Sequence, residues 1–176
     1  MKSHPGGEEH TRRLIALAAL PDGASVLDMG AGAGESVALL RELGYEARGI
    51  DLAPRAKSVE RGDLLRTSFP DGSFDAVLSQ CAFFVSGDQR AALGEAGRVL
   101  KPGGKLLLSD VFFEDPEALL RRAGFEVLLA EDMTPLWRAY YLEALWRGGA
   151  PCCEIPRGKS SYWLLIAGKD GTNGPV

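Results

Sequence analysis

Four residues with the spacing D-x-G-x-G-x-G form the strongest chemical signal in the sequence, and they are Asp28, Gly30, Gly32 and Gly34. They lie between an apolar run at 25–27 and a helical pattern at 36–43. Glycines have no Cβ, so the backbone can approach a ligand closely, and the N-terminus of the following helix favours a carboxylate or phosphate. Strand, glycine loop and helix in this order predict a ligand site at the carboxyl edge of a parallel sheet.

The residue after the third glycine argues against a nicotinamide dinucleotide. A G-x-G-x-x-G fingerprint that begins at Gly30 requires glycine at position 35, where this chain has Glu35. Asp51 ends the second apolar run, where a carboxylate can accept both hydroxyls of a ribose. A nicotinamide dehydrogenase is therefore disfavoured, and a purely structural glycine turn stays an alternative.

The elements around this loop follow from hydrophobic periodicity. Apolar runs bounded by turn residues predict strands over 25–27, 47–51, 57–61, 74–79, 105–109, 125–130 and 162–167. Helical spacing predicts one helix that ends before Pro21 and others over 36–43, 88–100, 115–124 and 134–146. Strands alternating with helices predict an α/β fold with a mostly parallel sheet covered on both faces.

Three signals set element boundaries. Residues 101–104, with the sequence Lys-Pro-Gly-Gly, predict a turn before the fifth strand. Asp115 followed by Pro116 predicts an N-cap and a first-turn proline, and Thr134 with Pro135 repeats that helix start.

Five motifs in order resemble class I S-adenosylmethionine-dependent methyltransferases of the small-molecule type, over about residues 25–110. The motifs are Val26-Leu27-Asp28-Met29-Gly30-Ala31-Gly32, Gly49-Ile50-Asp51, Gly62-Asp63-Leu64, the stretch 69–75 and the stretch 100–104. This resemblance implies a Rossmann-like, doubly wound sheet with an antiparallel last strand. It also implies S-adenosyl-L-methionine as the cofactor.

Site residues follow from the same resemblance. It implies that Asp28 and the backbone of Gly30 and Gly32 face the methionine part of the cofactor. Asp51 would face the ribose and Asp63 the adenine amino group. The full set of cofactor-binding residues that it implies is Asp28, Gly30, Ala31, Gly32, Gly34, Asp51, Leu52, Gly62, Asp63, Leu64, Ser79 and Gln80.

One departure from the family lies between the second and third strands. Only residues 52–56 separate Asp51 from the strand predicted at 57–61, and a parallel crossover usually takes a dozen or more residues. Five extended residues reach about 17 Å, barely enough to return along one strand. We therefore predict that the crossover helix beside the adenine pocket is missing or very short, or that the third strand is stunted.

Length and composition indicate a single domain over 1–176, and the resemblance implies that it is a methyltransferase domain. We divide it into an N-terminal helix and cap (1–23), a cofactor-binding core (24–130), an aromatic helix with a Cys loop and the last strand (131–168), and a mobile tail (169–176). The 20 Lys and Arg against 24 Asp and Glu argue against a nucleic-acid partner. No apolar run reaches the roughly 18 residues of a membrane span, and no leader is visible, which predicts a cytoplasmic protein.

Methyl transfer from a sulfonium is an in-line displacement, so the site must mainly align the acceptor and exclude water. A base helps only when the acceptor carries a proton that must leave, and His10 is a candidate for it. We expect a small-molecule acceptor near 80–84, near 110–113 and under the N-terminal segment. Aromatic residues that can either wall that pocket or form ordinary core are Phe83, Phe84, Phe112, Phe113, Trp137, Tyr140 and Tyr141.

Cys81 is a second candidate at the acceptor side. Ser79-Gln80-Cys81 is similar to a stretch of arsenite methyltransferases in which that cysteine helps bind trivalent arsenic. With Cys152 and Cys153, three thiolates would suit a soft metalloid acceptor, although no resident metal is predicted. The chain lacks the cysteine those enzymes carry after the glycine loop.

A noncatalytic S-adenosylmethionine-binding or interaction module is a further alternative. An open pocket beyond Cys81 and Asp110 favours an enzyme, whereas a filled one favours a binding role.

Overall fold

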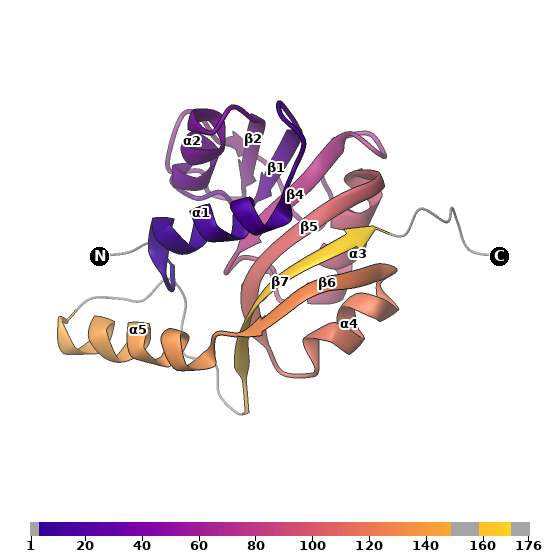
Figure 1. The fold of residues 1–176 in the computed structure, drawn as a ribbon. Helices are drawn as coiled ribbons and strands as arrows, with labels where there is room; N and C mark the ends of the chain where they lie inside the picture. The colour runs from indigo at the N-terminus through magenta and orange to yellow at the C-terminus, as the bar shows by residue number, and fades with distance from the viewer. Residues whose placement is uncertain (1–3, 149–158, 170–176) are drawn as a thin grey trace.

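A computed structural model describes residues 4–148 and 159–169, and one seven-stranded sheet organises them (Figure 1). The strands are β1 (Ser25–Met29), β2 (Glu46–Asp51), β3 (Glu60–Arg61), β4 (Phe74–Gln80), β5 (Leu100–Phe112), β6 (Phe125–Asp132) and β7 (Ser161–Lys169). The helices are α1 (Gly7–Ala18), α2 (Glu35–Glu42), α3 (Gln89–Val99), α4 (Pro116–Arg122) and α5 (Thr134–Trp146). Within the described ranges, no helix is both long and apolar enough to span a membrane.

The strand order is β3-β2-β1-β4-β5-β7-β6. Neighbours from β3 to β5 pair in parallel, and β7 is antiparallel to both β5 and β6. The α/β sheet with an antiparallel last strand is therefore confirmed. β2 lies on one side of β1 and β4 on the other, so the direction in which strands are added reverses between β1 and β4. Parallel α/β sheets bind ligands at such a point.

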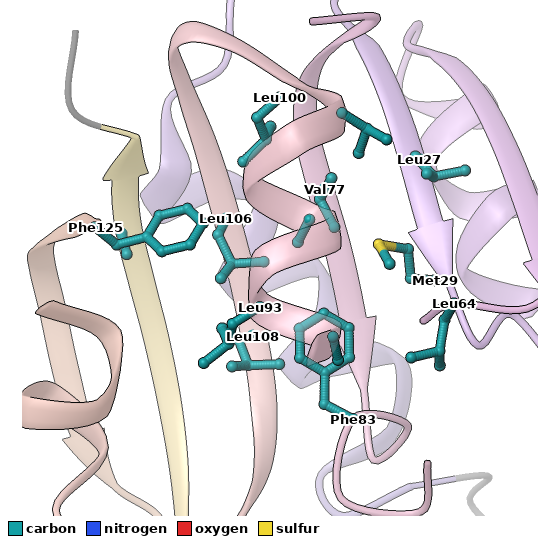
Figure 2. Packing of buried hydrophobic residues seen from close by; sticks show 14 of the residues in the cluster. Leu27, Met29, Leu64, Val77, Phe83, Leu93, Leu100, Leu106, Leu108 and Phe125 are labelled. Atoms are coloured by element: carbon teal, nitrogen blue, oxygen red, sulfur yellow. The ribbon is translucent and has the colours of Figure 1, made fainter. Parts of the chain in front are cut away.

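Two apolar cores lie on opposite faces of the sheet, because alternate residues of a strand point to opposite sides. Leu106 and Leu108 of β5 pack with α3 and α4, and Figure 2 shows them beside Leu93 of α3. Leu107 packs instead with α1 and α2. The central strands are thus buried on both faces, and their polar residues can be exposed only at the ends.

The crossover from β2 to β3 contains no helix, as predicted. Residues 52–59 form bends and turns, and β3 is two residues long rather than the predicted 57–61. The backbone N–H of Arg55 donates to the carbonyl of Gly32 over 2.9 Å. This bond fixes the short crossover onto the glycine loop.

Two boundary predictions were wrong in informative ways. Residues 101–104 do not precede β5 but interrupt it, because Leu100 pairs with Phe74 and Lys105 pairs with Ala76 while the four residues between them have no partner in β4. They form a bulge rather than a turn between two elements.

Thr134 is the first residue of α5 and not its N-cap, which is Met133. Its hydroxyl accepts the backbone N–H of Tyr162 over 3.0 Å. The Asp132 carboxylate accepts the N–H of Thr134 instead, over 2.8 Å. The hydroxyl therefore joins α5 to β7 rather than capping the helix.

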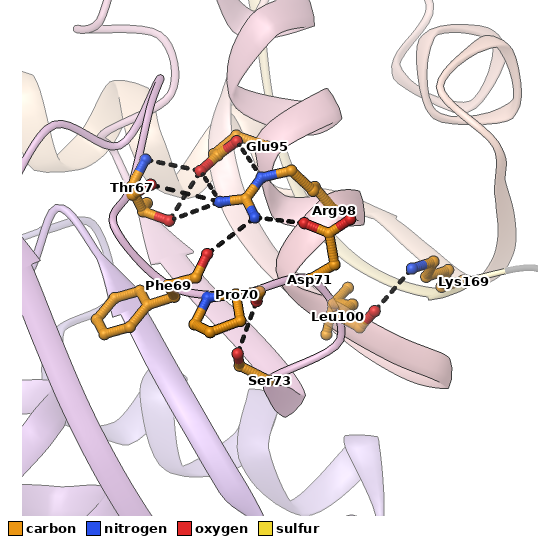
Figure 3. A network of polar contacts seen from close by, with 9 residues as sticks. All are labelled: Thr67, Phe69, Pro70, Asp71, Ser73, Glu95, Arg98, Leu100 and Lys169. Atoms are coloured by element: carbon orange, nitrogen blue, oxygen red, sulfur yellow. Dashed lines mark hydrogen bonds and ion pairs between the residues drawn. The ribbon is translucent and has the colours of Figure 1, made fainter.

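A polar network ties the segment before β4 to α3 (Figure 3). The Arg98 guanidinium donates to the Phe69 carbonyl over 2.8 Å and to the Asp71 carboxylate over 2.7 Å, and it pairs with Glu95 over 2.6 Å. Thr67 donates to Glu95 through its N–H and its hydroxyl, over 2.6 and 2.8 Å. Arg98 first, and then Thr67, lower the pKa of Glu95 to about 2, against the opposing effect of burial.

We expect Glu95→Gln to reduce the acid sensitivity of the fold. The pKa of Glu95 is lower in the folded chain than the ordinary 4.5, so its contribution is present above pH 4.5 and is lost as the pH falls towards 2. Urea unfolding at pH 7 should show a loss of roughly 1 kcal/mol in the variant. The difference between variant and wild type should shrink by pH 3. The same difference in unfolding free energy at pH 7 and pH 3 would contradict a stabilising role for the ionised Glu95.

Candidate functional site

A cavity of about 390 Å³ opens at the carboxyl ends of β1, β2 and β4, at the point where the strand order reverses. Its lining residues are His4, Asp28, Gly30, Ala31, Gly32, Ala33, Glu35, Ser36, Asp51, Leu52, Ala53, Arg55, Gly62, Asp63, Leu64, Leu65, Gln80, Cys81, Ala82, Val85 and Ser86. All predicted cofactor-binding residues except Gly34 and Ser79 are among them.

The glycine loop reaches this cavity because its backbone is bent sharply after β1. The N–H groups of Gly30 and Ala31 both donate to the Ile50 carbonyl at the end of β2, each over 2.9 Å. Gly30 has φ +91°, and a Cβ built on it would lie 2.2 Å from the Cβ of Ala82. The loop after β1 therefore touches the loop after β4, and only glycine fits at the contact.

Asp51, the last residue of β2, lines the cavity. Its Oδ2 accepts the N–H of Gly32 and its Oδ1 accepts the N–H of Ala53, both over 2.9 Å. The carboxylate is thus held at the end of β2, between the glycine loop and the crossover. Each oxygen keeps a lone pair for a further donor, because a carboxylate oxygen can accept two hydrogen bonds.

Asp63 also lines the cavity, and its side chain bonds to the backbone of the turn that contains it. Its Oδ1 accepts the N–H of Leu65 over 2.8 Å, and the side chain is exposed. Leu64 is buried, whereas Leu52 on the shortened crossover is 62% exposed. The predicted adenine end is consequently more open than the glycine-loop end.

Asp28 is the most unusual group in the cavity wall. It is 3% exposed on a central strand, and no described residue donates a hydrogen bond to its carboxyl group. Burial first, and then the charge of Asp51, raise the pKa of Asp28 to about 7. A buried carboxylate without a counter-charge is costly, so the site is suited to a ligand that brings a positive charge.

Asp110 is fully buried after the apolar part of β5. Its carboxyl accepts the backbone N–H groups of Phe84, over 3.1 Å, and of Val111, over 2.8 Å. Burial raises the pKa of Asp110 to about 7, although the backbone N–H groups of Val111, Phe84, Phe83 and Ala82 oppose the rise. Asp110 thus holds the loop after β4, and it does not line the cavity.

Cys81 does line the cavity, in a strained backbone conformation with φ +55°. Its N–H donates to the Ser109 carbonyl over 2.8 Å, and its sulfur lies 3.4 Å from the Tyr162 hydroxyl. Cys152 and Cys153 lie outside the described residues. Among the described residues, no three His, Cys, Asp or Glu side chains are grouped as metal ligands would be.

Several predicted site residues lie elsewhere. The Ser79 hydroxyl is buried and donates to the Met29 carbonyl over 2.7 Å, and Gly34 is the N-cap of α2. His10 does not line the cavity, whereas His4 does. Position relative to the first helix cannot distinguish the two histidines, because the turn at residues 4–7 decides which one faces inward.

Five of the predicted aromatic residues are buried in the core, whereas Phe84 is half-buried and Phe113 is 52% exposed. Phe83 and Phe112 are buried in the core on the α3 side. Trp137, Tyr140 and Tyr141 of α5 pack on Tyr162, with the Trp137 and Tyr162 rings stacked at 6.2 Å. None of the predicted aromatic residues lines the cavity.

Arg55 and Ser36 are among the cavity residues that were missed from sequence. Ser36 follows Glu35 in the first turn of α2, so its place after the glycine loop was a usable signal. Arg55 had no such signal, because only the absence of the crossover helix lets it face the loop.

Comparison with known proteins agrees with this geometry. A family model described as a methyltransferase domain matches residues 27–108. An uncharacterised methyltransferase from Geobacillus kaustophilus is 32% identical to this chain, in an alignment that covers 91% of this chain and 84% of that relative. This chain belongs to the methyltransferase family.

Other members of the methyltransferase family are similar over less of their length. An arsenite methyltransferase from Aquipseudomonas alcaligenes is 33% identical over 53% of this chain and 34% of its own length. The chain spans about a third to a half of the first curated relatives that it matches. The solved structure of Haemonchus contortus phosphoethanolamine N-methyltransferase 2 in complex with S-adenosyl-L-methionine has a TM-score of 0.75 at 18% identity, covering 96% of this chain and 54% of that one. This likeness shows the methyltransferase fold.

Proposed function

We propose that the chain transfers a methyl group from S-adenosylmethionine to a small-molecule acceptor. The buried Asp28 carboxyl carries this proposal, because it faces a cavity at the carboxyl ends of parallel strands and has no partner among the described residues. S-adenosylmethionine supplies an electrophilic methyl group on a sulfonium and also carries an ammonium group. A nicotinamide dinucleotide carries two negative phosphates, which Asp28 would repel.

The remaining wall residues fit the other parts of this cofactor. Asp51 has lone pairs for the ribose hydroxyls beyond the two N–H groups it already binds. Asp63 keeps one carboxylate oxygen that no described residue contacts, and it can accept an amino group. Leu64 offers an apolar surface beside it.

Space for an acceptor supports an enzyme over a noncatalytic module. The cavity continues past Cys81 to Val85 and Ser86, while the region at Asp110 is filled by the loop that Asp110 binds. The acceptors in the names of the two related proteins, arsenite and phosphoethanolamine, are both small. A small acceptor suits the size of this cavity.

Arsenite is a second candidate acceptor, because the Cys81 thiol faces the cavity and an arsenite methyltransferase is among the relatives. Incubation with arsenite and labelled cofactor should then yield methylated arsenic, and Cys81→Ser should prevent it. If arsenite protects none of the thiols from an alkylating reagent, arsenite is not the acceptor.

Calorimetric titration tests the proposed cofactor. We expect S-adenosylmethionine and S-adenosylhomocysteine to bind with micromolar dissociation constants. Millimolar or undetectable binding of both would overturn the proposal.

We expect the Asp28→Asn variant to bind S-adenosylmethionine at least about tenfold more weakly at pH 8. Asp28 must be ionised to pair with a cation, so the ratio of variant to wild-type dissociation constants should rise as the pH increases from 6 to 8. In the protein without cofactor, ionisation of Asp28 has the opposite effect and lowers the stability of the fold. Because the folded pKa of about 7 exceeds the ordinary 3.8, ionisation costs stability as the pH rises between these values. A pH-independent ratio would contradict the role of Asp28.

A further inference from the structure

The side-chain amide of Gln80 is held in the cavity wall by two other segments of the chain. Gln80 is the last residue of β4 and lines the cavity. Its Oε1 lies 3.2 Å from the Thr11 hydroxyl of α1 and 3.1 Å from the Ser36 hydroxyl of α2. Its Nε2 has no partner among the described residues, so it is available to a ligand.

This network continues to His4, which is 9% exposed and also lines the cavity. The His4 Nε2 lies 3.2 Å from the Thr11 hydroxyl oxygen, and its Nδ1 lies 3.1 Å from the Pro5 carbonyl. A carbonyl oxygen only accepts, so Nδ1 carries a hydrogen. Nε2 is then an acceptor when His4 is neutral and a donor when His4 is charged.

The single proton of the Thr11 hydroxyl links these two groups, and the Gly7 carbonyl, at 3.4 Å, is the most distant of the three acceptors that this proton can reach. When His4 is charged, its Nε2 donates to Thr11, and Thr11 donates to the Gln80 Oε1. When His4 is neutral, Thr11 donates to Nε2, and its oxygen can only accept from Gln80. The Gln80 amide must then turn over, because only its nitrogen can donate. Distances of 3.1 and 3.2 Å suit an N–H···O bond as well, and Ser36 can donate or accept.

We propose that protonation of His4 orients the Gln80 amide, so that a charged His4 directs the amide N–H groups towards the carboxylate of the bound cofactor. A neutral His4 directs the amide oxygen there instead. The inference rests on the proposed function, because the carboxylate belongs to the methionine part of S-adenosylmethionine. Asp28, in register with Leu78 two residues before Gln80, faces the same part of the cavity and pairs with the ammonium group.

Other ionisable groups surround this network and must be separated from it. Those that share the cavity wall are Asp28, Glu35, Asp51, Arg55, Asp63 and Cys81. On α1, the ionisable residues nearest in sequence to Thr11 are Glu8, Glu9, His10, Arg12 and Arg13. These groups are the same in the variant and in wild type. The ratio of the two dissociation constants at each pH therefore cancels their contributions.

The experiment compares Thr11→Val with Thr11→Ser, which keeps the hydroxyl. The probes are S-adenosylhomocysteine, which has the carboxylate, and 5′-methylthioadenosine, which lacks the amino-acid part. For S-adenosylhomocysteine, we expect Thr11→Val to raise the dissociation constant about tenfold at pH 5.5 and less than twofold at pH 8. Thr11→Ser should match wild type, and 5′-methylthioadenosine should show no pH-dependent ratio.

A ratio that does not change with pH, or the same change for 5′-methylthioadenosine, would overturn the inference. If Thr11→Val does not fold, His4→Phe serves instead, because it removes the titrating ring at similar size and leaves the Thr11 hydroxyl to donate to the Gln80 Oε1 at every pH. Its dissociation constant for S-adenosylhomocysteine should then equal that of wild type at pH 5.5 and lie below that of wild type at pH 8. If wild type binds S-adenosylhomocysteine normally while the ratios stay flat, only this inference fails. Absence of binding by wild type at every pH would overturn the proposed function and with it this inference.

Discussion

Gly30→Ala should destabilise the fold by about 3 kcal/mol or more and weaken cofactor binding by at least about 100-fold. The added Cβ would lie 2.2 Å from the Cβ of Ala82, and φ at this position is +91°. Neither loop can yield easily, because the Gly30 N–H donates to the Ile50 carbonyl and the Ala82 carbonyl accepts the N–H of Ser86. Urea unfolding and calorimetric titration with S-adenosylhomocysteine measure the two effects.

Gly44 provides a matched control, because its φ of +90° is nearly the same and nothing lies within 4 Å of the position of its Cβ. Gly44→Ala should therefore cost only about 1 kcal/mol, from backbone strain, and leave binding unchanged. Adding Ala82→Gly to the Gly30→Ala variant removes the clash and should recover most of the binding. Equal losses in the two single variants would show that the contact between the loops is unimportant.

Asp110→Ala should have the second large effect, a loss of about 4 kcal/mol in the free energy of unfolding. Removing the carboxyl leaves the N–H group of Phe84, in the loop after β4, and that of Val111, in β5, without this acceptor, and each unsatisfied buried donor costs roughly 1–3 kcal/mol. The cavity wall from Cys81 to Ser86 depends on that loop. Any variant that remains folded should consequently bind S-adenosylhomocysteine weakly.

Asp115 is the control for Asp110. It accepts the N–H groups of Glu117 and Ala118, over 3.0 and 3.4 Å, but it is an exposed helix cap. Water can replace its oxygens, so Asp115→Ala should cost about 1 kcal/mol and leave binding intact. Thermal unfolding of both variants distinguishes the buried acceptor from the exposed one. Similar losses for the two would contradict the role assigned to Asp110.

Local signals in the sequence predicted most of the fold. The glycine loop, the Asp115 cap and the continuous apolar part of β5 each depend on neighbours in sequence, and the structure has all three where expected. The short interval after Asp51 likewise predicted the missing helix, because chain length limits a crossover regardless of tertiary contacts.

The errors arose where a residue's partner is distant in sequence. Threonine is a common N-cap residue, but the Thr134 hydroxyl accepts the backbone N–H of Tyr162 in β7 instead. His4 rather than His10 reaches the cavity because a turn before α1 brings it to Thr11. Asp110 was visible as a polar residue after an apolar run, but the Phe84 N–H that it accepts comes from the loop after a different strand, β4.

The position of β7 between β5 and β6 has a consequence for synthesis on the ribosome. β7 is the last of the seven strands in chain order, yet it supplies the hydrogen bonds that hold β6 in the sheet. Until residues 161–169 emerge, β6 has no strand partner and β5 presents an open edge that can pair with another nascent chain. We therefore expect the cofactor half, from β1 to β4, to become ordered first, and the emerging chain to need protection from aggregation until β7 is inserted.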